Sequence, residues 1–325
     1  MSNILITGAA GFIGFHLTKI LCQNNHYKIT GIDNLNDYYD VQLKQDRLSL
    51  LEQHTNFEFH KIDLCEKNKI DQLFSDKHFD YVVNLAAQAG VRHSIEAPYK
   101  YMESNLIGFI NILEACRHFP VKHLIFASSS SVYGNSTNIP FSTSQKTDEP
   151  VSLYAATKKS NELMAHSYSA LYKIPTTGLR FFTAYGPWGR PDMAYFSFTK
   201  KIMEDNPIQV FNHGKMQRDF TYIDDITQAI SKLIRLTPNG ETPYKLFNIG
   251  NQQPIELGAF IETLENVIGK KAIKEYFPMQ PSDVMTTYAD TEELRSAIEF
   301  YPNTPLKDGL EKFFEWYKEY YKRER

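Results

Sequence analysis

The first half of the chain alternates short apolar runs with segments of helical periodicity, and this order constrains the fold more than any other feature. The apolar runs are NILIT, YKITGI, FEFHKI, YVVNLAA and HLIFASS, and the helical patterns lie at about 12–25, 38–53, 66–77, 98–118 and 154–172. Such alternation is typical of parallel sheets, because each helix crosses over a face of the sheet in the right-handed sense. We therefore expect an α/β fold with a doubly wound parallel sheet.

The rhythm changes after IPTTGLRFF. The Pro- and Gly-rich YGPWGRP precedes expected helices near 193–204, 224–235 and 255–268, strands at PIQVF, KLFNIG and 273–277, and terminal helices ending in FFEWYKEYY. No repeat or low-complexity linker separates the halves, which favours a second lobe assembled on the first. We expect a sheet domain at 1–180 and a smaller mixed α/β substrate lobe at 181–325, with some late segments returning to the first domain.

Bulk properties exclude several functional classes. A net charge of −3 without a long basic run argues against nucleic acid as a main partner. No stretch approaches the roughly 20 apolar residues of a membrane span, and no leader pattern precedes MSNILITG, so we expect a cytoplasmic protein. Cys22, Cys65 and Cys116 are odd in number and widely spaced. We expect buried free thiols, with neither a disulfide framework nor a metal site.

A glycine-rich turn, TGAAGFIG, follows the first expected strand and opens the first helix. Gly8 permits the tight turn, Gly11 lets the backbone approach a diphosphate, and Gly14 allows close packing of the helix, whose N-terminus then faces the phosphates. A glycine pattern is weak evidence alone, but the strand before it and the helix after it are the context that a dinucleotide site requires. Residues 1–180 are therefore expected to form a Rossmann-like NAD-binding domain.

Asp33 ends the second expected strand, near the spacing of an acid that binds the adenosine ribose. A carboxylate there accepts hydrogen bonds from both ribose hydroxyls and repels the extra phosphate of NADP, so NAD is the predicted cofactor. Asp63 and Leu64, after the third strand, fit two roles, adenine contact or helix capping. The remaining predicted cofactor contacts from these strand ends and the first turn are Phe12, Ile13, Asn34, Ala86 and Ala87.

Tyr154 and Lys158, in YAATK, lie one helical turn apart on one face. An ammonium there would favour the tyrosinate and lower the pKa of Tyr154, which makes the tyrosine a candidate general base. This spacing also arises by chance in many surface helices. The expected dinucleotide site favours the catalytic interpretation, and HLIFASSSSVYG places four serines at the carboxyl end of a central strand, where doubly wound sheets bind ligands.

The Ser-Tyr-Lys set together with the glycine turn resembles the extended short-chain dehydrogenase/reductase family over essentially the whole chain. The resemblance implies that the catalytic hydroxyl is Ser129, three residues before the Val of VYG, and that it relays a sugar proton to Tyr154. It also implies that Lys158 binds the nicotinamide ribose and that Asn105, in ESNLIGF, is the family's helical asparagine. An ordinary polar helix position is the alternative for Asn105.

The residues around the catalytic serine discriminate among reactions of the family. Dehydratases of nucleotide sugars carry an Asp-Glu pair directly after this hydroxyl, and uronate decarboxylases keep an acid before VYG. Here Ser130 and Ser131 stand instead. An epimerase needs no such acid, because it removes a hydride from one sugar carbon and returns it to the other face.

GPWGRPDMA, NHGKMQRDFTYIDD, GIDNLNDYYD and NLAAQAGVRHS resemble the corresponding segments of UDP-glucuronate 4-epimerases. Thr183 follows the Arg-Phe-Phe run, where epimerases of neutral sugars usually have Asn. Arg190, on the Trp-Gly-Arg-Pro segment, can offer a bidentate fork to a carboxylate, and Thr183 a hydroxyl. The resemblance adds four substrate contacts, Arg218 for the diphosphate, Asp283 for the uridine ribose, Arg92 near the sugar or diphosphate, and Ser130.

The sequence thus predicts NAD-dependent epimerisation of UDP-glucuronate to UDP-galacturonate at C4 through a transient 4-keto sugar. The other interpretations are a C4 epimerase of a neutral UDP-hexose or UDP-N-acetylhexosamine, a UDP-uronate decarboxylase, and a protein that senses NAD(H) without turnover. The family resemblance also implies a homodimer. Apolar positions in 98–118 and 154–172 fit either a four-helix interface or helices that cover the sheet.

Overall fold

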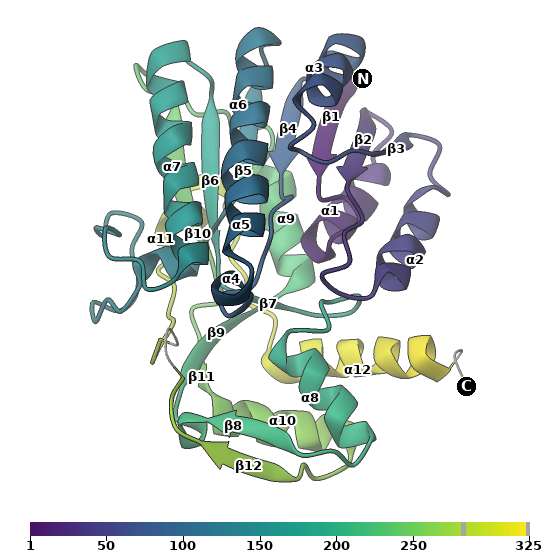
Figure 1. Ribbon diagram of the computed structural model, residues 1–325, viewed down its shortest axis with the longest axis vertical. Helices are drawn as coiled ribbons and strands as arrows, with labels where there is room; N and C mark the ends of the chain where they lie inside the picture. Colours follow the sequence, from purple (N-terminus) through teal and green to yellow (C-terminus); the bar gives the residue numbers. More distant parts are fainter. Residues whose placement is uncertain (281–283, 323–325) are drawn as a thin grey trace.

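The computed structural model describes residues 1–280 and 284–322, and its central feature is a seven-stranded sheet (Figure 1). The strand order is β10-β6-β5-β4-β1-β2-β3, and all neighbours run parallel. The strands are β1 Ser2–Thr7, β2 Tyr27–Asp33, β3 Phe57–Lys61, β4 Tyr81–Asn84, β5 His123–Ser129, β6 Thr176–Phe181 and β10 Tyr244–Ile249. The expected doubly wound sheet is confirmed. Its order reverses between β1 and β4, the point at which such sheets bind ligands.

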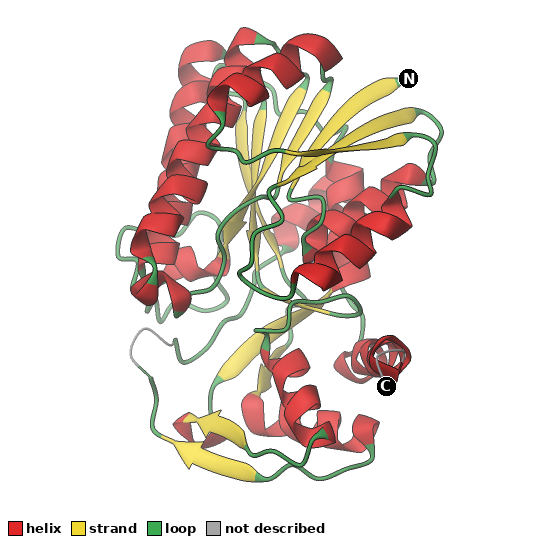
Figure 2. Ribbon diagram, turned by 45° about the vertical axis from the view of Figure 1, so that its right-hand side comes forward, coloured by secondary structure: helices red, strands yellow, loops and turns green. Residues whose placement is uncertain are grey.

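Helices cover both faces of this sheet (Figure 2). One face packs against α1, α9 and α11, with α2 beside α1, and the other against α3, α6 and α7. Along β1, Ile4 and Ile6 join the first core and Leu5 the second, which explains the unbroken apolar run. The helices are α1 Phe12–Cys22, α2 Val41–Leu51, α3 Lys67–Lys77, α6 Gly108–His118, α7 Leu153–Tyr172, α9 Ile223–Leu233 and α11 Glu292–Ile298.

The second lobe contains two small sheets below the large one (Figure 1). Strand β9 pairs parallel with β7 and antiparallel with β11, and β8 pairs parallel with β12. An aromatic core that includes Tyr195, Phe196, Phe260 and Phe313 joins these sheets to three helices. The elements are β7 Thr183–Tyr185, α8 Ala194–Met203, β8 Ile208–Phe211, β9 Gln217–Tyr222, β11 Pro254–Glu256, α10 Leu257–Ile268, β12 Lys274–Phe277 and α12 Leu306–Lys322.

Several late segments belong to the large sheet. Strand β10 pairs with β6, and α9 and α11 pack against the same face as α1. The sequence pattern did not indicate β7, β9 and β11, which are short or carry charged residues. The domain boundary near residue 180 stays a prediction.

The helical segment expected over 98–118 is confirmed in its bounds, but its middle is π-helical, which was not predicted. The chain forms α4 His93–Glu96, α5 Pro98–Tyr101, a π-helical segment Met102–Ile107, and then α6. Within the π-helical segment, the carbonyl oxygen of Asn105 accepts a hydrogen bond from Nδ2 of Asn161 on α7, at 2.6 Å. This carbonyl is therefore bound by a neighbouring helix. Single π turns of this kind occur often at functional sites.

Other boundaries move by a few residues. Helix α2 begins at Val41 because Asp40 caps it, its Oδ1 accepting a hydrogen bond from the Gln42 N–H at 2.9 Å. The strand expected in YVVNLAA ends at Asn84, after which the chain turns into the pocket described below. Cys22 and Cys116 are buried free thiols as expected, whereas Cys65 is exposed, so the expectation of burial is wrong there.

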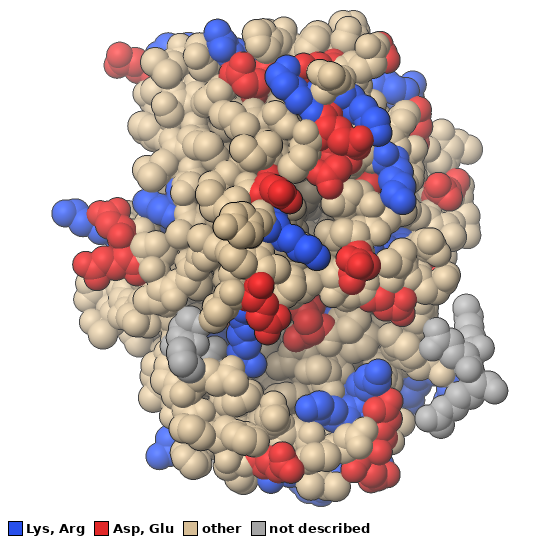
Figure 3. All heavy atoms as spheres, in the orientation of Figure 1, with Lys and Arg blue, Asp and Glu red and all other residues tan. Residues whose placement is uncertain are grey.

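The surface is mixed in charge. On the face in Figure 3, Lys and Arg side chains are interspersed with Asp and Glu rather than gathered in a basic stripe. None of the described helices has the length and apolar character needed to cross a membrane.

Candidate active site

A deep pocket lies at the carboxyl ends of the sheet strands and is completed by the second lobe. Its lining includes most of the predicted residues, namely Gly8, Gly11, Phe12, Ile13, Gly14, Asp33, Asn34, Asp63, Leu64, Ala86, Ala87, Ser129, Ser130, Tyr154, Lys158, Thr183, Arg190 and Arg218. Of the described residues predicted for the site, Asn105 and Arg92 are outside this lining. Asp283 lies outside the residues that the structure describes.

The glycine turn builds one end of the pocket. Gly8 has a φ of 71°, and a Cβ on Gly14 would lie 2.0 Å from the Gly8 carbonyl oxygen, so both positions require glycine. Helix α1 follows with Gly11 as its N-cap, with no side-chain capping bond and no acid in its first turn. Its first N–H groups are therefore available to an anion in the pocket, as a dinucleotide diphosphate requires.

Asp33 stands beside this turn and is almost fully buried. Its Oδ1 accepts a hydrogen bond from the Leu35 N–H at 2.8 Å. Burial raises the pKa of Asp33, while the nearby Lys44 ammonium and backbone N–H groups oppose that rise. The carboxylate thus meets cations and donors on the protein side, in the position suited to ribose hydroxyls.

Asp63 does not cap helix α3, whose N-cap residue is Glu66, so the capping alternative is wrong. Its Oδ1 accepts from the Cys65 N–H at 2.8 Å, and its Oδ2 from Asn34 Nδ2 at 2.7 Å. Burial acts to raise the pKa of Asp63, but these hydrogen bonds lower it overall. The carboxylate shapes the turn after β3 and also faces the pocket, with Asn34 held against it.

Asn105 acts behind the lining. It is buried, its Oδ1 accepts from the Gln88 N–H at 2.8 Å, and its Nδ2 donates to the Thr157 hydroxyl at 3.0 Å. These bonds join the loop after β4, which carries Ala86 and Ala87, to helix α7. The structure therefore places Asn105 as a support for pocket residues.

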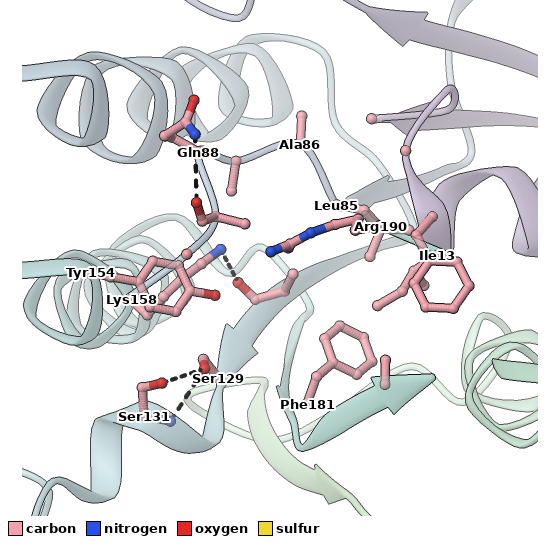
Figure 4. A pocket seen from close by; sticks show the side chains of 18 of the residues that line it. Ile13, Leu85, Ala86, Gln88, Ser129, Ser131, Tyr154, Lys158, Phe181 and Arg190 are labelled. Carbon is pink, nitrogen blue, oxygen red and sulfur yellow. Dashed lines mark hydrogen bonds between the residues drawn. The ribbon is translucent and has the colours of Figure 1, made fainter. Parts of the chain in front are cut away.

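Tyr154, Lys158 and Ser129 converge in the middle of the pocket (Figure 4). Both α7 residues face β5, and Lys158 Nζ donates to the carbonyl oxygen of Ala127 at 2.8 Å. Ser129 Oγ donates to Ser131 Oγ at 3.1 Å and accepts from the Ser131 N–H at 3.2 Å. Tyr154 lies close to Ser129, which acts to lower the pKa of the tyrosine. The hydroxyl pair is in place for a proton relay.

The expected lowering of the Tyr154 pKa is wrong for this structure. Burial raises the pKa of Tyr154 above 10, and the opposing influences are the neighbouring Ser129 hydroxyl and the Arg190 charge. Lys158 Nζ lies 6.0 Å from the Tyr154 ring centroid, and burial lowers its own pKa from 10.5 to about 8. Loss of hydration disfavours both charged forms, an effect that helical spacing does not reveal.

A buried ion pair that the sequence analysis missed lies behind this triad. Arg180 on β6 donates from Nε and Nη2 to the two carboxylate oxygens of Glu162, each at 2.8 Å. Ser128 Oγ donates to the same carboxylate at 2.6 Å. Glu162 lies one helical turn after Lys158, and Ser128 precedes Ser129. The ion pair therefore fixes α7 against β6, and the Ser128 bond fixes it against β5. The signal in the sequence was the glutamate on the Tyr154–Lys158 face.

Arg190 reaches the pocket from the segment after β7 (Figure 4). Its Nε and Nη2 donate to the Asp192 carboxylate at 3.0 and 2.5 Å. Tyr38, from the loop after β2, donates its hydroxyl to Asp192 Oδ2 at 3.2 Å. Burial acts to lower the pKa of Arg190, but Asp192 raises it overall, so the guanidinium is cationic. Asp192 and Tyr38 were not predicted as site residues.

The other predicted substrate residues occupy the lobe side. Thr183 and Arg218 line the pocket, and Arg218 Nη1 donates to the Gln217 carbonyl oxygen at 2.8 Å. Arg92 is exposed, with its guanidinium 4.8 Å from the Phe211 ring centroid. Over the ranges 1–280 and 284–322, no group of three or more His, Cys, Asp or Glu side chains is arranged to hold a metal ion.

Comparison with known proteins supports this arrangement. A solved UDP-glucuronic acid 4-epimerase from Bacillus cereus, in complex with UDP-glucuronic acid and NAD, superposes with a TM-score of 0.92 at 34% identity, covering 98% of this chain and 100% of that one. Protein CapI of Staphylococcus aureus is 56% identical over 99% of this chain and 100% of its own length. A probable UDP-glucuronate 4-epimerase of Rhizobium meliloti is 43% identical over 98% of both chains.

The sequence model of one family matches residues 4–250, which include the Ser129, Tyr154 and Lys158 set and the Arg190 segment. This chain therefore belongs to the NAD dependent epimerase/dehydratase family.

Proposed function

We propose that this protein is a UDP-glucuronate 4-epimerase, which interconverts UDP-glucuronate and UDP-galacturonate with NAD as a retained cofactor. One observation carries the proposal: a single pocket contains the triad Tyr154, Lys158 and Ser129 together with Arg190 and Thr183. The triad suits removal and return of a hydroxyl proton, and the arginine suits a carboxylate. The activity named for the Rhizobium meliloti and Bacillus cereus relatives supports the same reaction.

The pocket fits NAD. The glycine turn and the uncapped N-terminus of α1 would hold the diphosphate, and Asp33 would accept hydrogen bonds from the ribose hydroxyls. Lys158 would bind the nicotinamide ribose, and Asn105 would support the loop after β4. When bound, NAD supplies the oxidant for C4 of the sugar and returns the hydride to the opposite face.

Tyr154 would take the proton of the sugar 4-hydroxyl, with Ser129 as the relay between them. Burial disfavours the tyrosinate, so the neighbouring cations have to favour it. Lys158, with a pKa of about 8, is mostly protonated at pH 7, and Arg190 adds a second positive charge. After the keto sugar has turned over, Tyr154 returns the proton.

The carboxylate of the substrate gives Arg190 and Thr183 a second role, the prevention of decarboxylation. Oxidation at C4 turns the uronate into a β-keto acid, which loses carbon dioxide when its carboxylate bond aligns with the carbonyl π system. Arg190 and Thr183 would hold that bond out of alignment. Ser130 would contact the sugar, Arg218 the diphosphate, Asp283 the uridine ribose, and Arg92 an outer part of the substrate.

A homodimer is part of the proposal. Helices α6 and α7 lie side by side on one face (Figure 1). Apolar side chains of α7 and of the segment before α6 are exposed there, with Tyr99 81%, Ile107 52%, Leu163 59% and Leu171 68% accessible. Exposed apolar side chains on neighbouring helices suit the self-complementary interface of a twofold dimer. Light scattering after gel filtration should give the mass of two chains.

A cytoplasmic location stays a prediction.

The direct test is incubation of purified protein with UDP-glucuronate, followed by chromatographic separation of the UDP-sugars. We expect UDP-galacturonate without consumption of added NAD. Absence of this product under every NAD condition would reject the proposal. Release of UDP-pentose and carbon dioxide as main products would favour a decarboxylase, and turnover of UDP-glucose at an equal rate would favour a neutral-sugar epimerase.

A further inference from the structure

One edge of the Arg190 guanidinium is already bound to a carboxylate of the protein. Nε and Nη2 donate to Asp192, and the two side chains are only 22% and 32% exposed. Towards the described residues, Nη1 makes no hydrogen bond, so this nitrogen is available to a ligand in the pocket. The substrate carboxylate would therefore meet an arginine whose charge is partly neutralised.

Asp192 is itself held in place from the cofactor side. Tyr38 donates its hydroxyl to Asp192 Oδ2, and its ring lies 4.9 Å from the His93 ring and 5.9 Å from the Arg190 guanidinium carbon. The Tyr38 hydroxyl also packs against Gly90, where an added Cβ would lie only 2.4 Å away. Tyr38 thus links Asp192 to the loop after β4.

The proposed reaction makes an unusual demand on this arginine. The keto sugar must present its two faces in turn to one cofactor, so its carboxylate has to leave Arg190 and bind again within each turnover. A buried guanidinium without a counter-ion is strongly disfavoured. An arginine that depended on the substrate for its counter-ion would therefore hold the carboxylate too tightly for fast turning.

We propose that Asp192 is a permanent counter-ion of Arg190, which keeps the guanidinium neutralised and aimed while the substrate carboxylate leaves and returns. This inference rests on the proposed function and assigns Asp192 as a positioning residue that also sets the affinity for acidic sugars. It predicts an effect with opposite signs on binding and turnover. Without the Asp192 charge, the substrate carboxylate becomes the counter-ion of Arg190, so binding tightens and turnover slows.

The test uses the NAD-loaded protein and its Asp192→Asn variant. Calorimetry measures the dissociation constants of UDP-glucuronate and of UDP-glucose, which lacks the carboxylate. We expect the constant for UDP-glucuronate to fall about tenfold and that for UDP-glucose to change less than about twofold, while kcat for UDP-glucuronate falls. The matched control is Asp37→Asn, which removes an exposed charge from the loop that carries Tyr38 and should change neither constant.

Tyr38→Phe is the second variant, should Asp192→Asn fail to fold. It loosens Asp192 without removing a charge, so the same shifts should appear in weaker form. Unchanged or equally altered affinities for the two sugars in these variants would overturn the role of Asp192. Because these are binding measurements, they separate the two proposals. A wild-type protein that makes no UDP-galacturonate contradicts the proposed function, whereas an active wild type with unshifted variants contradicts only this inference.

Discussion

Glu162 on α7 accepts two hydrogen bonds, both at 2.8 Å, from Nε and Nη2 of Arg180 on β6. Both side chains are almost completely buried, at 3% and 2% exposure. Ser128 Oγ completes the site by donating to Glu162 Oε1 at 2.6 Å. Since Ser128 precedes Ser129 and Glu162 follows Lys158 by one turn, these three side chains set the position of α7 relative to β5 and β6.

Glu162→Gln should therefore lower the unfolding free energy of the protein and reduce kcat. The substitution leaves the Arg180 charge buried without a counter-ion, which typically costs about 3–5 kcal/mol of unfolding free energy. Urea denaturation at pH 7 measures this loss. Asp71→Asn, which breaks the exposed pair with Lys67, is the control and should cost less than about 1 kcal/mol. Similar losses in the two variants would contradict the supporting role of Glu162.

Tyr154→Phe should reduce kcat by about 10²–10⁴-fold, because the ring remains while the proton acceptor is lost. The dissociation constant for UDP should stay nearly unchanged. Steady-state kinetics and calorimetry on the NAD-loaded protein check both statements. Tyr301→Phe removes a hydroxyl from a half-exposed ring away from the pocket and should leave kcat unaltered. A Tyr154→Phe protein with wild-type kcat would remove this residue from the mechanism.

Lys158 predicts a specific dependence of stability on pH. Its pKa is about 8 in the folded protein and 10.5 as the ordinary value, so between these values the unfolded chain binds the proton and the folded chain does not. Its contribution to stability therefore rises with pH through this window and is lost as pH falls to 8. Between pH 8 and pH 10, the unfolding free energy of the wild type should rise by roughly 2 kcal/mol relative to that of Lys158→Met. Guanidinium denaturation at both pH values measures this gain, and a constant difference would contradict it.

Arg190→Ala should weaken the binding of UDP-glucuronate at least about tenfold, because this substrate has a carboxylate that pairs with Arg190. The affinity for UDP-glucose, which lacks the carboxylate, should change less than about twofold. Competition binding against a fluorescent UDP derivative gives both constants. The UDP-pentose share of the products should also increase, since the carboxylate is no longer held out of alignment. Equal weakening of both sugars would reject the carboxylate contact.

The sequence predicted the large sheet well because its central strands β1, β4 and β5 are mostly buried and rich in apolar residues. The sequence also predicted the glycine turn, Asp33 and the Tyr154–Lys158 spacing, since each depends on local chain geometry. The π-helical segment could not be predicted, because the hydrogen bond to its Asn105 carbonyl comes from Asn161 on α7, which is distant in sequence. Strands β7 and β11 were missed because they have only three residues each, and β9 because its charged residues hide a clear alternating pattern.

The site was predictable as a set of residues but not as an electrostatic system. Every residue predicted to bind NAD lines the pocket except Asn105. The rise in the Tyr154 pKa depends on burial by several elements, which no local spacing reports. Likewise, Asp192 follows Arg190 closely in the sequence, yet its role emerges only when Tyr38 is brought against it by the fold.

The central claim is that C4 is oxidised and reduced by one retained cofactor. UDP-glucuronate carrying deuterium at C4 tests it most directly, with the UDP-galacturonate product examined by mass spectrometry and NMR. We predict that the product keeps its deuterium at C4, in unlabelled water and without added NADH. Replacement of that deuterium by solvent hydrogen, or a requirement for stoichiometric NADH, would contradict the account.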